Sequence, residues 1–296
     1  MRKPAALLLI AAALPLMGQI APSPAPLDPM ASDKTPSYEW VRPQADYIRR
    51  EVMVPMRDGT KLFTVIVMRK GTKDGPILLS RTPYNATAAT SRNRSQKIEE
   101  ILPVMDAPFV NDGYIRVYQD IRGMYKSQGD YVMTRPLRGA LNKTRVDHAT
   151  DAYDTIDWLV KNVPEANGKV ATIGSSYLGF TTLMSLIDPH PALKAAVPQS
   201  PMVDGWMGDD WFHNGAFRTF GFDFALGQMV ERGGGAVPMG TGDEYVSYLK
   251  AGSSAGYARL WGIENLPVVR KMMEHPAYDS YWQEQAVDKL LAKRKL

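Results

Sequence analysis

The chain has 296 residues, of which 45% are hydrophobic and 22% are charged. This size and composition support one large or two ordinary domains with a sizeable core, and they exclude disorder as the main state. The net charge is +4, and it falls further if Arg2 and Lys3 leave with a leader, so no nucleic-acid-binding surface is indicated. The absence of Cys excludes disulfides, thiolate nucleophiles, thiolate-bound zinc and iron–sulfur clusters.

The N-terminus has the layout of a signal peptide. Met1-Arg2-Lys3 precedes an apolar run from Ala5 to Met17, which is too short to span a bilayer. We expect residues 1–18 to be removed and the protein to be periplasmic or secreted, with an uncleaved membrane anchor as the alternative. Residues 19–45 are rich in Pro and are expected to form an extended connector.

Residues 46–205 are predicted to form an α/β core. Apolar and β-branched runs predict strands, in chain order, at residues 47–55, 61–68, 76–80, 114–120, 169–173 and 193–197. Helical spacing predicts helices at residues 147–160 and 176–186. Strands that alternate with helices indicate a mostly parallel sheet that is covered on both faces. Residues 206–296 are predicted to form a helical cap, with helices near 245–251 and 280–293.

The segment Gly174-Ser175-Ser176-Tyr177-Leu178-Gly179 lies between a predicted strand and a predicted helix, where a nucleophile elbow is found. Gly is needed two residues before the nucleophile, because a Cβ there would strike the turn. This rule selects Ser176 and rejects Ser175, which has Ile173 at that position. The general G-x-S-x-G pattern has Gly where this chain has Leu178. A serine at such a place is also often only a helix N-cap, and the elbow alone leaves this alternative open.

The hexapeptide resembles the G-x-S-Y-x-G elbow of the CocE/NonD hydrolases. This group includes α-amino acid ester hydrolases, cocaine esterase, glutaryl-7-aminocephalosporanic acid acylases and X-prolyl dipeptidyl peptidases. Other segments are similar to motifs of the same family: Arg57-Asp58-Gly59-Thr60-Lys61-Leu62, Arg81-Thr82-Pro83-Tyr84, Gln119-Asp120-Ile121-Arg122-Gly123 with Ser127 and Gly129, and residues 151–159. The resemblance runs from about residue 47 to the C-terminus. It implies an α/β-hydrolase fold with a helical cap.

The resemblance also implies roles for individual residues. The sequence has neither an H-E-x-x-H motif nor an acidic calcium loop, so we expect no metal, and we expect no cofactor. Ser176 is the implied nucleophile, and the side-chain hydroxyl of Tyr84 and the backbone N–H of Tyr177 form the implied oxyanion hole. Without the family, a Tyr in the position of Tyr84 would be taken as an amphipathic surface residue.

The segment from Pro201 to Phe212 is most similar to that of the α-amino acid ester hydrolases. In those enzymes an Asp of this segment helps to hold the α-ammonium group of the substrate. Asp210 is our choice for this role and Asp209 is the reserve. The alternative is that these acids complement the dipole of a helix N-terminus.

The sequence offers no clear general base to take the proton of the serine hydroxyl. In this fold the carboxylate and the His of a catalytic triad follow the Ser along the chain. Of the four histidines, His148 precedes the elbow and His190 follows the nucleophile's helix too soon. His213 and His275 lie in the predicted cap without the family's surrounding residues, and His213 is the first to suspect. We therefore expect this chain to be the N-terminal part of a longer enzyme, without the triad Asp and His or a C-terminal jelly-roll domain.

Together these features predict a serine hydrolase or acyltransferase for esters or amides of α-amino acids, including β-lactam antibiotics. It would act through an acyl-enzyme on Ser176, with little activity in this chain alone. X-prolyl dipeptidyl peptidase or glutaryl acylase activity is one alternative, and a catalytically dead secreted binding module is another. The expected partner is a small ester or amide with a free α-amino group, not nucleic acid or a membrane. A homo-oligomer is left open.

Overall fold

The computed structural model describes residues 28–31, 44–208, 211–218, 221–229 and 243–294. The chain forms two compact units, Met1–Tyr38 and Glu39–Leu296, and all the elements below belong to the second. The predicted leader and most of the predicted connector lie outside the described residues. Within the described ranges, none of the helices combines the length and the apolar character needed to cross a bilayer.

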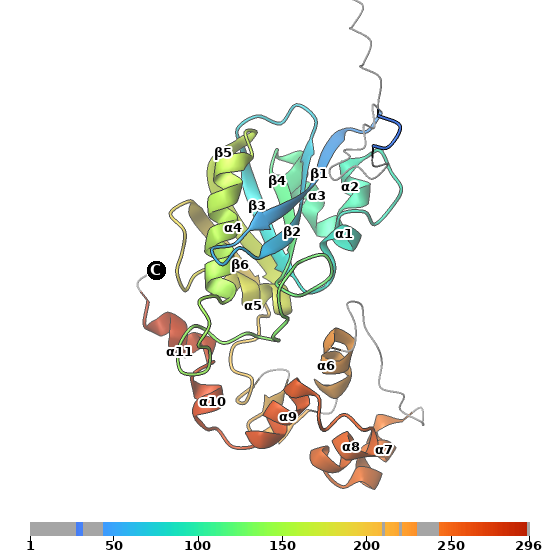
Figure 1. Ribbon diagram of the computed structural model, residues 1–296, viewed down its shortest axis with the longest axis vertical. Coiled ribbons are helices and arrows are strands. Elements are labelled where there is room, and N and C mark those ends of the chain that lie inside the picture. Colours follow the sequence, from blue (N-terminus) through green and yellow to red (C-terminus); the bar gives the residue numbers. More distant parts are fainter. Residues whose placement is uncertain (1–27, 32–43, 209–210, 219–220, 230–242, 295–296) are drawn as a thin grey trace, which may run out of the picture. The chain divides into compact units, whose positions relative to one another are not determined.

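One mixed sheet forms the centre of the second unit (Figure 1). Its spatial order is β1-β2-β4-β3-β5-β6, with β1–β2 and β2–β4 antiparallel and the other pairs parallel. The strands are β1 (Tyr47–Pro55), β2 (Lys61–Arg69), β3 (Gly75–Thr82), β4 (Ile115–Asp120), β5 (Ala166–Ser175) and β6 (Leu193–Gln199). All six predicted strands are therefore confirmed, with ends that differ by a few residues.

The burial of the strands explains this order. Strands β3 and β4 are buried along almost their whole length, as expected for central strands with helices on both faces. Strand β6 lies at the edge of the sheet and leaves several side chains exposed, among them Val197 at 44%. The β1–β2 hairpin turns at Gly59, whose φ of 84° suits glycine.

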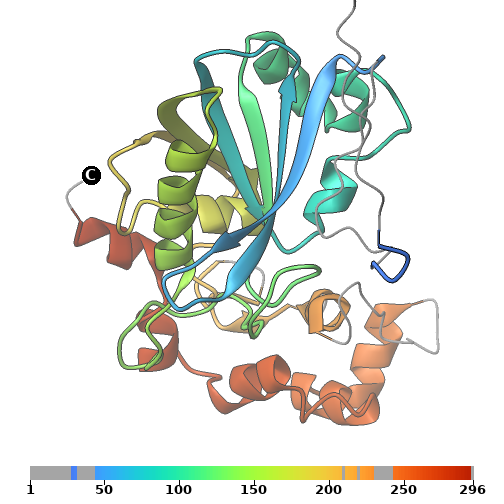
Figure 2. The same ribbon diagram turned by 45° about the horizontal axis from the view of Figure 1, so that its top comes forward.

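Helices cover the two faces of the sheet, as Figures 1 and 2 show. On one face, Val65 and Val67 of β2 pack in a cluster with Ile98, Ile101 and Val110 of short helices. These short elements are α1 (Ala86–Ala89), α2 (Ile98–Ile101), the 3₁₀ turn η1 (Val104–Asp106) and α3 (Ala107–Asn111). The sequence did not predict them.

On the other face, Ile66 and Met68 of β2 pack in a cluster with Ile156 and Leu159 of α4 (His148–Asn162). Neighbouring residues of β2 thus point to opposite layers, as the two-residue period of a strand requires. Helix α4 begins with a capping box of Asp147 and Thr150. Helix α5 (Tyr177–Met184) follows β5 directly. This architecture confirms the predicted α/β-hydrolase fold.

The segment after β6 is mainly helical. It contains the short hairpin of β7 (Phe212–His213) and β8 (Ala216–Phe217), and the helices α6 (Gly221–Met229), α7 (Glu244–Ala251), α8 (Ser254–Leu260), α9 (Pro267–Glu274), α10 (Ser280–Gln283) and α11 (Val287–Ala292). The helical pieces predicted near 245–251 and 280–293 are present, the first as α7 and the second as the two short helices α10 and α11. At the start of α11 the backbone N–H of Val287 donates to the Val203 carbonyl (2.8 Å), and Val287 lies in the core cluster around Tyr177.

Candidate active site

The turn between β5 and α5 holds Ser176 in a strained conformation. Its backbone has φ 58° and ψ −123°, and a non-glycine residue in such a region costs about 1–3 kcal/mol. Two hydrogen bonds fix the turn: the Ser176 N–H donates to the Gln199 carbonyl of β6 (3.0 Å), and the Ser176 carbonyl accepts from the Phe180 N–H (3.0 Å). The geometry is that of a sharp strand-to-helix turn that exposes one side chain above the sheet.

The side chain of Ser176 does not cap α5. Ser176 occupies the N-cap position, yet its hydroxyl makes no capping hydrogen bond, and the residue is exposed. The N-cap alternative therefore lacks the hydrogen bond that defines it. The hydroxyl is accessible for chemistry instead.

The two glycines of the elbow leave room for its backbone. A Cβ on Gly174 would lie 2.6 Å from the carbonyl carbon of Leu178 and closer still to Leu178 Cβ. A Cβ on Gly179 would lie 2.6 Å from the carbonyl oxygen of Gln199. Gly179, which comes one place later than the Gly of the general pattern, is thus required because β6 lies so close to it. Leu178 occupies the space that the missing side chain of Gly174 leaves.

Tyr84 lies in a firmly held turn after β3. Thr82 Oγ1 accepts a hydrogen bond from the Tyr84 N–H (2.9 Å), and Asp120 Oδ1 accepts one from the Ala86 N–H (2.6 Å). Between them Asn85 has a φ of 77°, and its side chain caps α1. The Tyr84 side chain is 42% exposed. The backbone of this turn is therefore fixed while the phenol stays accessible.

Tyr177 is the first residue of α5, so its backbone N–H has no acceptor within the helix. Its side chain points elsewhere and is fully buried, with the ring edge-to-face against His148 and Phe180. Burial raises the pKa of the Tyr177 hydroxyl to about 12, and the nearby Tyr84 hydroxyl adds to the increase.

All four histidines lie within the described residues. In that part of the chain, none of them is hydrogen-bonded to the Ser176 hydroxyl. His148 is buried beneath the elbow, and burial holds its pKa well below the usual value. His190 lies 3.5 Å from Asp157. His213 is exposed on β7, and His275 pairs with Asp279 at 2.7 Å.

Asp209 and Asp210, the predicted ammonium ligands, lie outside the described residues. Their neighbours on either side are described: Gly208 forms a β-bridge with His213, and Trp211 is buried in an aromatic cluster with Phe212 and Trp282.

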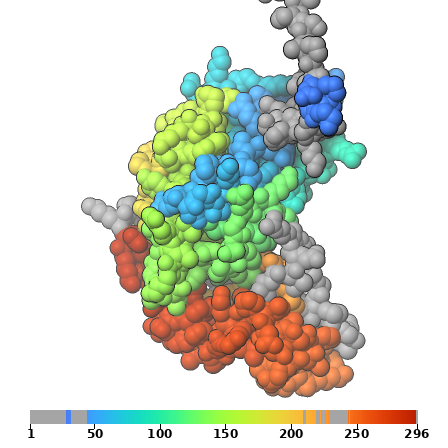
Figure 3. Space-filling model, viewed as in Figure 1, coloured from blue at the N-terminus to red at the C-terminus, as the bar shows by residue number. Residues whose placement is uncertain are grey.

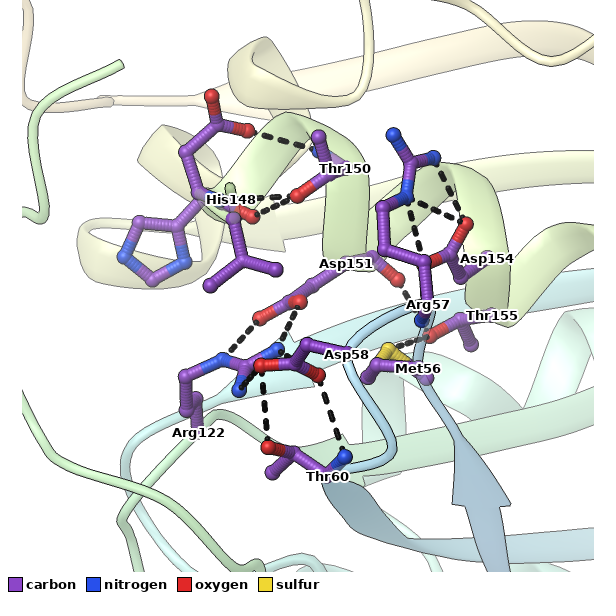
Figure 4. A network of polar contacts seen from close by, with 12 residues as sticks. Met56, Arg57, Asp58, Thr60, Arg122, His148, Thr150, Asp151, Asp154 and Thr155 are labelled. Carbon is purple, nitrogen blue, oxygen red and sulfur yellow. Dashed lines mark hydrogen bonds and ion pairs between the residues drawn. The ribbon is translucent and has the colours of Figure 1, made fainter. Parts of the chain in front are cut away.

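Several charged residues of the family-like motifs form a polar network between the first hairpin and α4 (Figure 4). Arg122 lies between Asp151 of α4 and Asp58 of the first hairpin, with its shortest contacts at 2.6 Å and 2.7 Å. Arg57 pairs with Asp154 at 2.7 Å. These residues tie the first hairpin to α4, so their part is structural support of the core and not direct chemistry.

Arg81 performs a similar task closer to the elbow. Its guanidinium donates to Gln119 Oε1 (2.8 Å) and to the His148 carbonyl (2.9 Å), and its carbonyl accepts from Thr181 Oγ1 of α5 (2.8 Å). The strand that leads to the Tyr84 turn is thereby bonded to the helix that follows Ser176. Sequence reasoning missed this connection, because only the motif and not the partners of Arg81 can be seen along the chain.

Comparison with known proteins places the chain in a family. The sequence profile described as X-Pro dipeptidyl-peptidase (S15 family) matches residues 58–296. The chain belongs to the S15 family. The resemblance inferred from the motifs is thus confirmed, and the members of this family are hydrolases.

Individual relatives of this S15 protein agree. A solved α-amino acid ester hydrolase is 56% identical with a TM-score of 0.85, over 91% of this chain and 44% of that one. An aminopeptidase from a marine sediment Thaumarchaeota archaeon is 50% identical with a TM-score of 0.84, over 90% of this chain and 44% of that one. Cocaine esterase of Rhodococcus sp. (strain MB1 Bresler) is 27% identical over 250 residues, 80% of this chain and 40% of that protein. The chain therefore spans less than half the length of these relatives.

Proposed function

We propose that Ser176 is the nucleophile of a serine hydrolase that acts on esters or amides of α-amino acids. The observation that carries the proposal is the strained, uncapped and exposed Ser176 at the β5–α5 turn. Its Oγ would attack the substrate carbonyl, form an acyl-enzyme and release the alcohol or amine. The Tyr177 N–H and the Tyr84 hydroxyl would stabilise the negative charge that develops on the carbonyl oxygen.

The preference for α-amino substrates rests on Asp210, with Asp209 in reserve. A carboxylate here would replace the water that an ammonium group loses on entering the site. The α-amino acid ester hydrolase and the aminopeptidase among the similar structures support this substrate class. β-Lactam antibiotics whose acyl group carries an α-amino group belong to it. The family description favours release of X-Pro dipeptides as the second candidate.

We also propose that the chain alone turns over little substrate, since no histidine contacts Ser176 in the described structure. A serine hydroxyl is a weak nucleophile until a base takes its proton. Deacylation also needs a base to activate water. Acylation by an activated ester should therefore be slow, and the acyl group, once transferred, should stay on the protein. Export to the periplasm or beyond, directed by residues 1–18, belongs to the same proposal.

The test is mass spectrometry of the intact chain after incubation with the p-nitrophenyl ester of an α-amino acid. We expect an adduct of one acyl group that peptide mapping assigns to Ser176. The adduct should be absent in Ser176→Ala and retained in Ser175→Ala. Loss of the adduct in Ser175→Ala alone would overturn the assignment.

A second comparison tests the substrate class. Asp210→Asn should slow acylation by the α-amino ester and leave acylation by its desamino analogue unchanged, because only the first ester loses a charge-assisted contact. Equal loss with both esters would favour the alternative role of Asp210 at a helix N-terminus.

A further inference from the structure

The side chain of Tyr177 makes hydrogen bonds that the oxyanion hole does not use. Its hydroxyl accepts a hydrogen bond from the Thr134 N–H (2.9 Å) and interacts with the hydroxyl of Tyr131. Neither contact involves the backbone N–H that would face the substrate. The phenol of Tyr177 is thus anchored at its far end, beneath the elbow.

Tyr131 lies three residues before Thr134 and extends the contacts of this segment to α6. Its hydroxyl donates to Gln228 Oε1 at 2.6 Å, and Gln228 is 7% exposed. Burial raises the pKa of Tyr131 far above its usual value, so the phenol stays neutral. The segment that carries Tyr131 and Thr134 is therefore bonded to the first residue of α5 through Thr134 and to α6 through Tyr131.

Tyr131 stands on a tightly folded segment. The segment from residue 121 to residue 137 has Gly123 at a φ of 77°, where a Cβ would lie 2.6 Å from the carbonyl carbon of Asp130. Thr134, which donates to Tyr177, has a φ of 44°. Tyr131 packs against the same core cluster as Tyr177. In the space-filling view the green surface of this part of the chain adjoins the orange and red helices (Figure 3). The phenol of Tyr131 therefore has little freedom to move away.

We infer that Tyr131 is a positioning residue for the elbow, held from α6 by Gln228. The inference rests on the proposed function of Ser176 and Tyr177. The rigid Tyr177 ring joins the hydrogen bonds at its hydroxyl to the backbone N–H at its other end. Fixing the hydroxyl thus fixes the direction of the N–H, and α6 acts on the oxyanion hole without touching the reacting atoms.

Isosteric removal of one hydroxyl tests this role. Misplacement of a catalytic group by about 1 Å costs up to about 100-fold in rate, and loss of an oxyanion donor costs about 100- to 1,000-fold. Tyr131→Phe leaves the Tyr177 N–H in place but removes the hydroxyl that bonds to Gln228. We therefore expect the acylation rate at saturating ester to fall about tenfold. The half-saturating ester concentration should change less than about twofold.

Tyr118→Phe is the matched control. Tyr118 is also buried, and its hydroxyl donates to Asp106 at 2.8 Å in the cluster on the other side of β4. We expect Tyr118→Phe to lower the melting temperature as much as Tyr131→Phe does and to leave the acylation rate unchanged. The double variant Tyr131→Phe/Tyr177→Phe should acylate no more slowly than the slower single variant, because both remove the same chain of hydrogen bonds.

Hydrogen exchange gives a readout that needs no catalysis. In Tyr131→Phe the amides of residues 221–229 should exchange faster than in the wild-type chain, whereas Tyr118→Phe should leave them unchanged. A wild-type chain without a Ser176 adduct would overturn the proposed function, and exchange would then decide whether Tyr131 links α6 to the elbow. Three results would each overturn the inference. They are an acylation rate of Tyr131→Phe equal to that of the wild type, equal rate losses in Tyr131→Phe and Tyr118→Phe, and unchanged hydrogen exchange in α6 of Tyr131→Phe.

Discussion

Replacing Gly174 by Ala tests the geometry on which the choice of Ser176 depends. The added Cβ would lie 2.6 Å from the carbonyl carbon and 2.7 Å from the carbonyl oxygen of Leu178. Carbon atoms prefer separations of about 3.5–4.0 Å, so the first turn of α5 must move by about 1 Å. Backbone atoms cannot rotate away as a side chain can. We therefore expect about 3 kcal/mol of destabilisation, at the upper end of the usual cost of overpacking.

The measurement is urea unfolding, followed by circular dichroism, of Gly174→Ala beside Gly139→Ala. A Cβ on Gly139 would meet no atom closer than 3.9 Å, and its φ is not positive. This control separates the clash from the general effect of replacing a glycine by an alanine. We expect a lower midpoint with an unchanged slope for Gly174→Ala. A loss within about 0.5 kcal/mol of the control would refute the reasoning, because so small a change is typical of surface substitutions.

Three further predictions follow from the core and the sheet edge. Asp151→Asn leaves the buried Arg122 without its closest partner and should cost about 3 kcal/mol in urea unfolding, whereas Arg270→Gln in an exposed pair should leave the unfolding free energy unchanged. Burial raises the pKa of Asp120 from 3.8 to about 6, so its contribution to stability is present in acid and is lost as the pH rises through 6. That loss is on the order of 3 kcal/mol. Asp120→Asn should remove it, and a pH series that falls as steeply as the wild type would contradict this. Val197→Lys on the edge strand should reduce light scattering on storage at an unchanged melting temperature, and equal scattering would show that aggregation starts elsewhere.

The sequence predicted the elements that have a pattern of their own. Strands β2 and β3 are recognisable because their burial on both faces demands nearly continuous apolar runs. Helix α4 is long enough to show helical spacing. Helices α1 and α2 have only four residues each, too few to show a period. The hydrogen bond of Val287 at the start of α11 goes to Val203, which lies far away along the chain.

The same distinction applies to the candidate site. The turn at Ser176 could be predicted because the need for space at Gly174 is a local property. The link from Tyr131 to Gln228 joins residues 97 positions apart, and Tyr131 belongs to a segment without regular structure. No sequence pattern predicts a contact between residues so far apart. Asp210 stays a prediction, since it lies outside the described residues.

The strain at Ser176 has a consequence for how this position evolves. A positive φ is a conformation that glycine adopts without steric cost, so stability alone would favour glycine over serine here. The fold thus retains a residue that works against its own stability, as happens where activity and stability are in conflict. A lineage that no longer needed the hydroxyl would be expected to drift to glycine at this position.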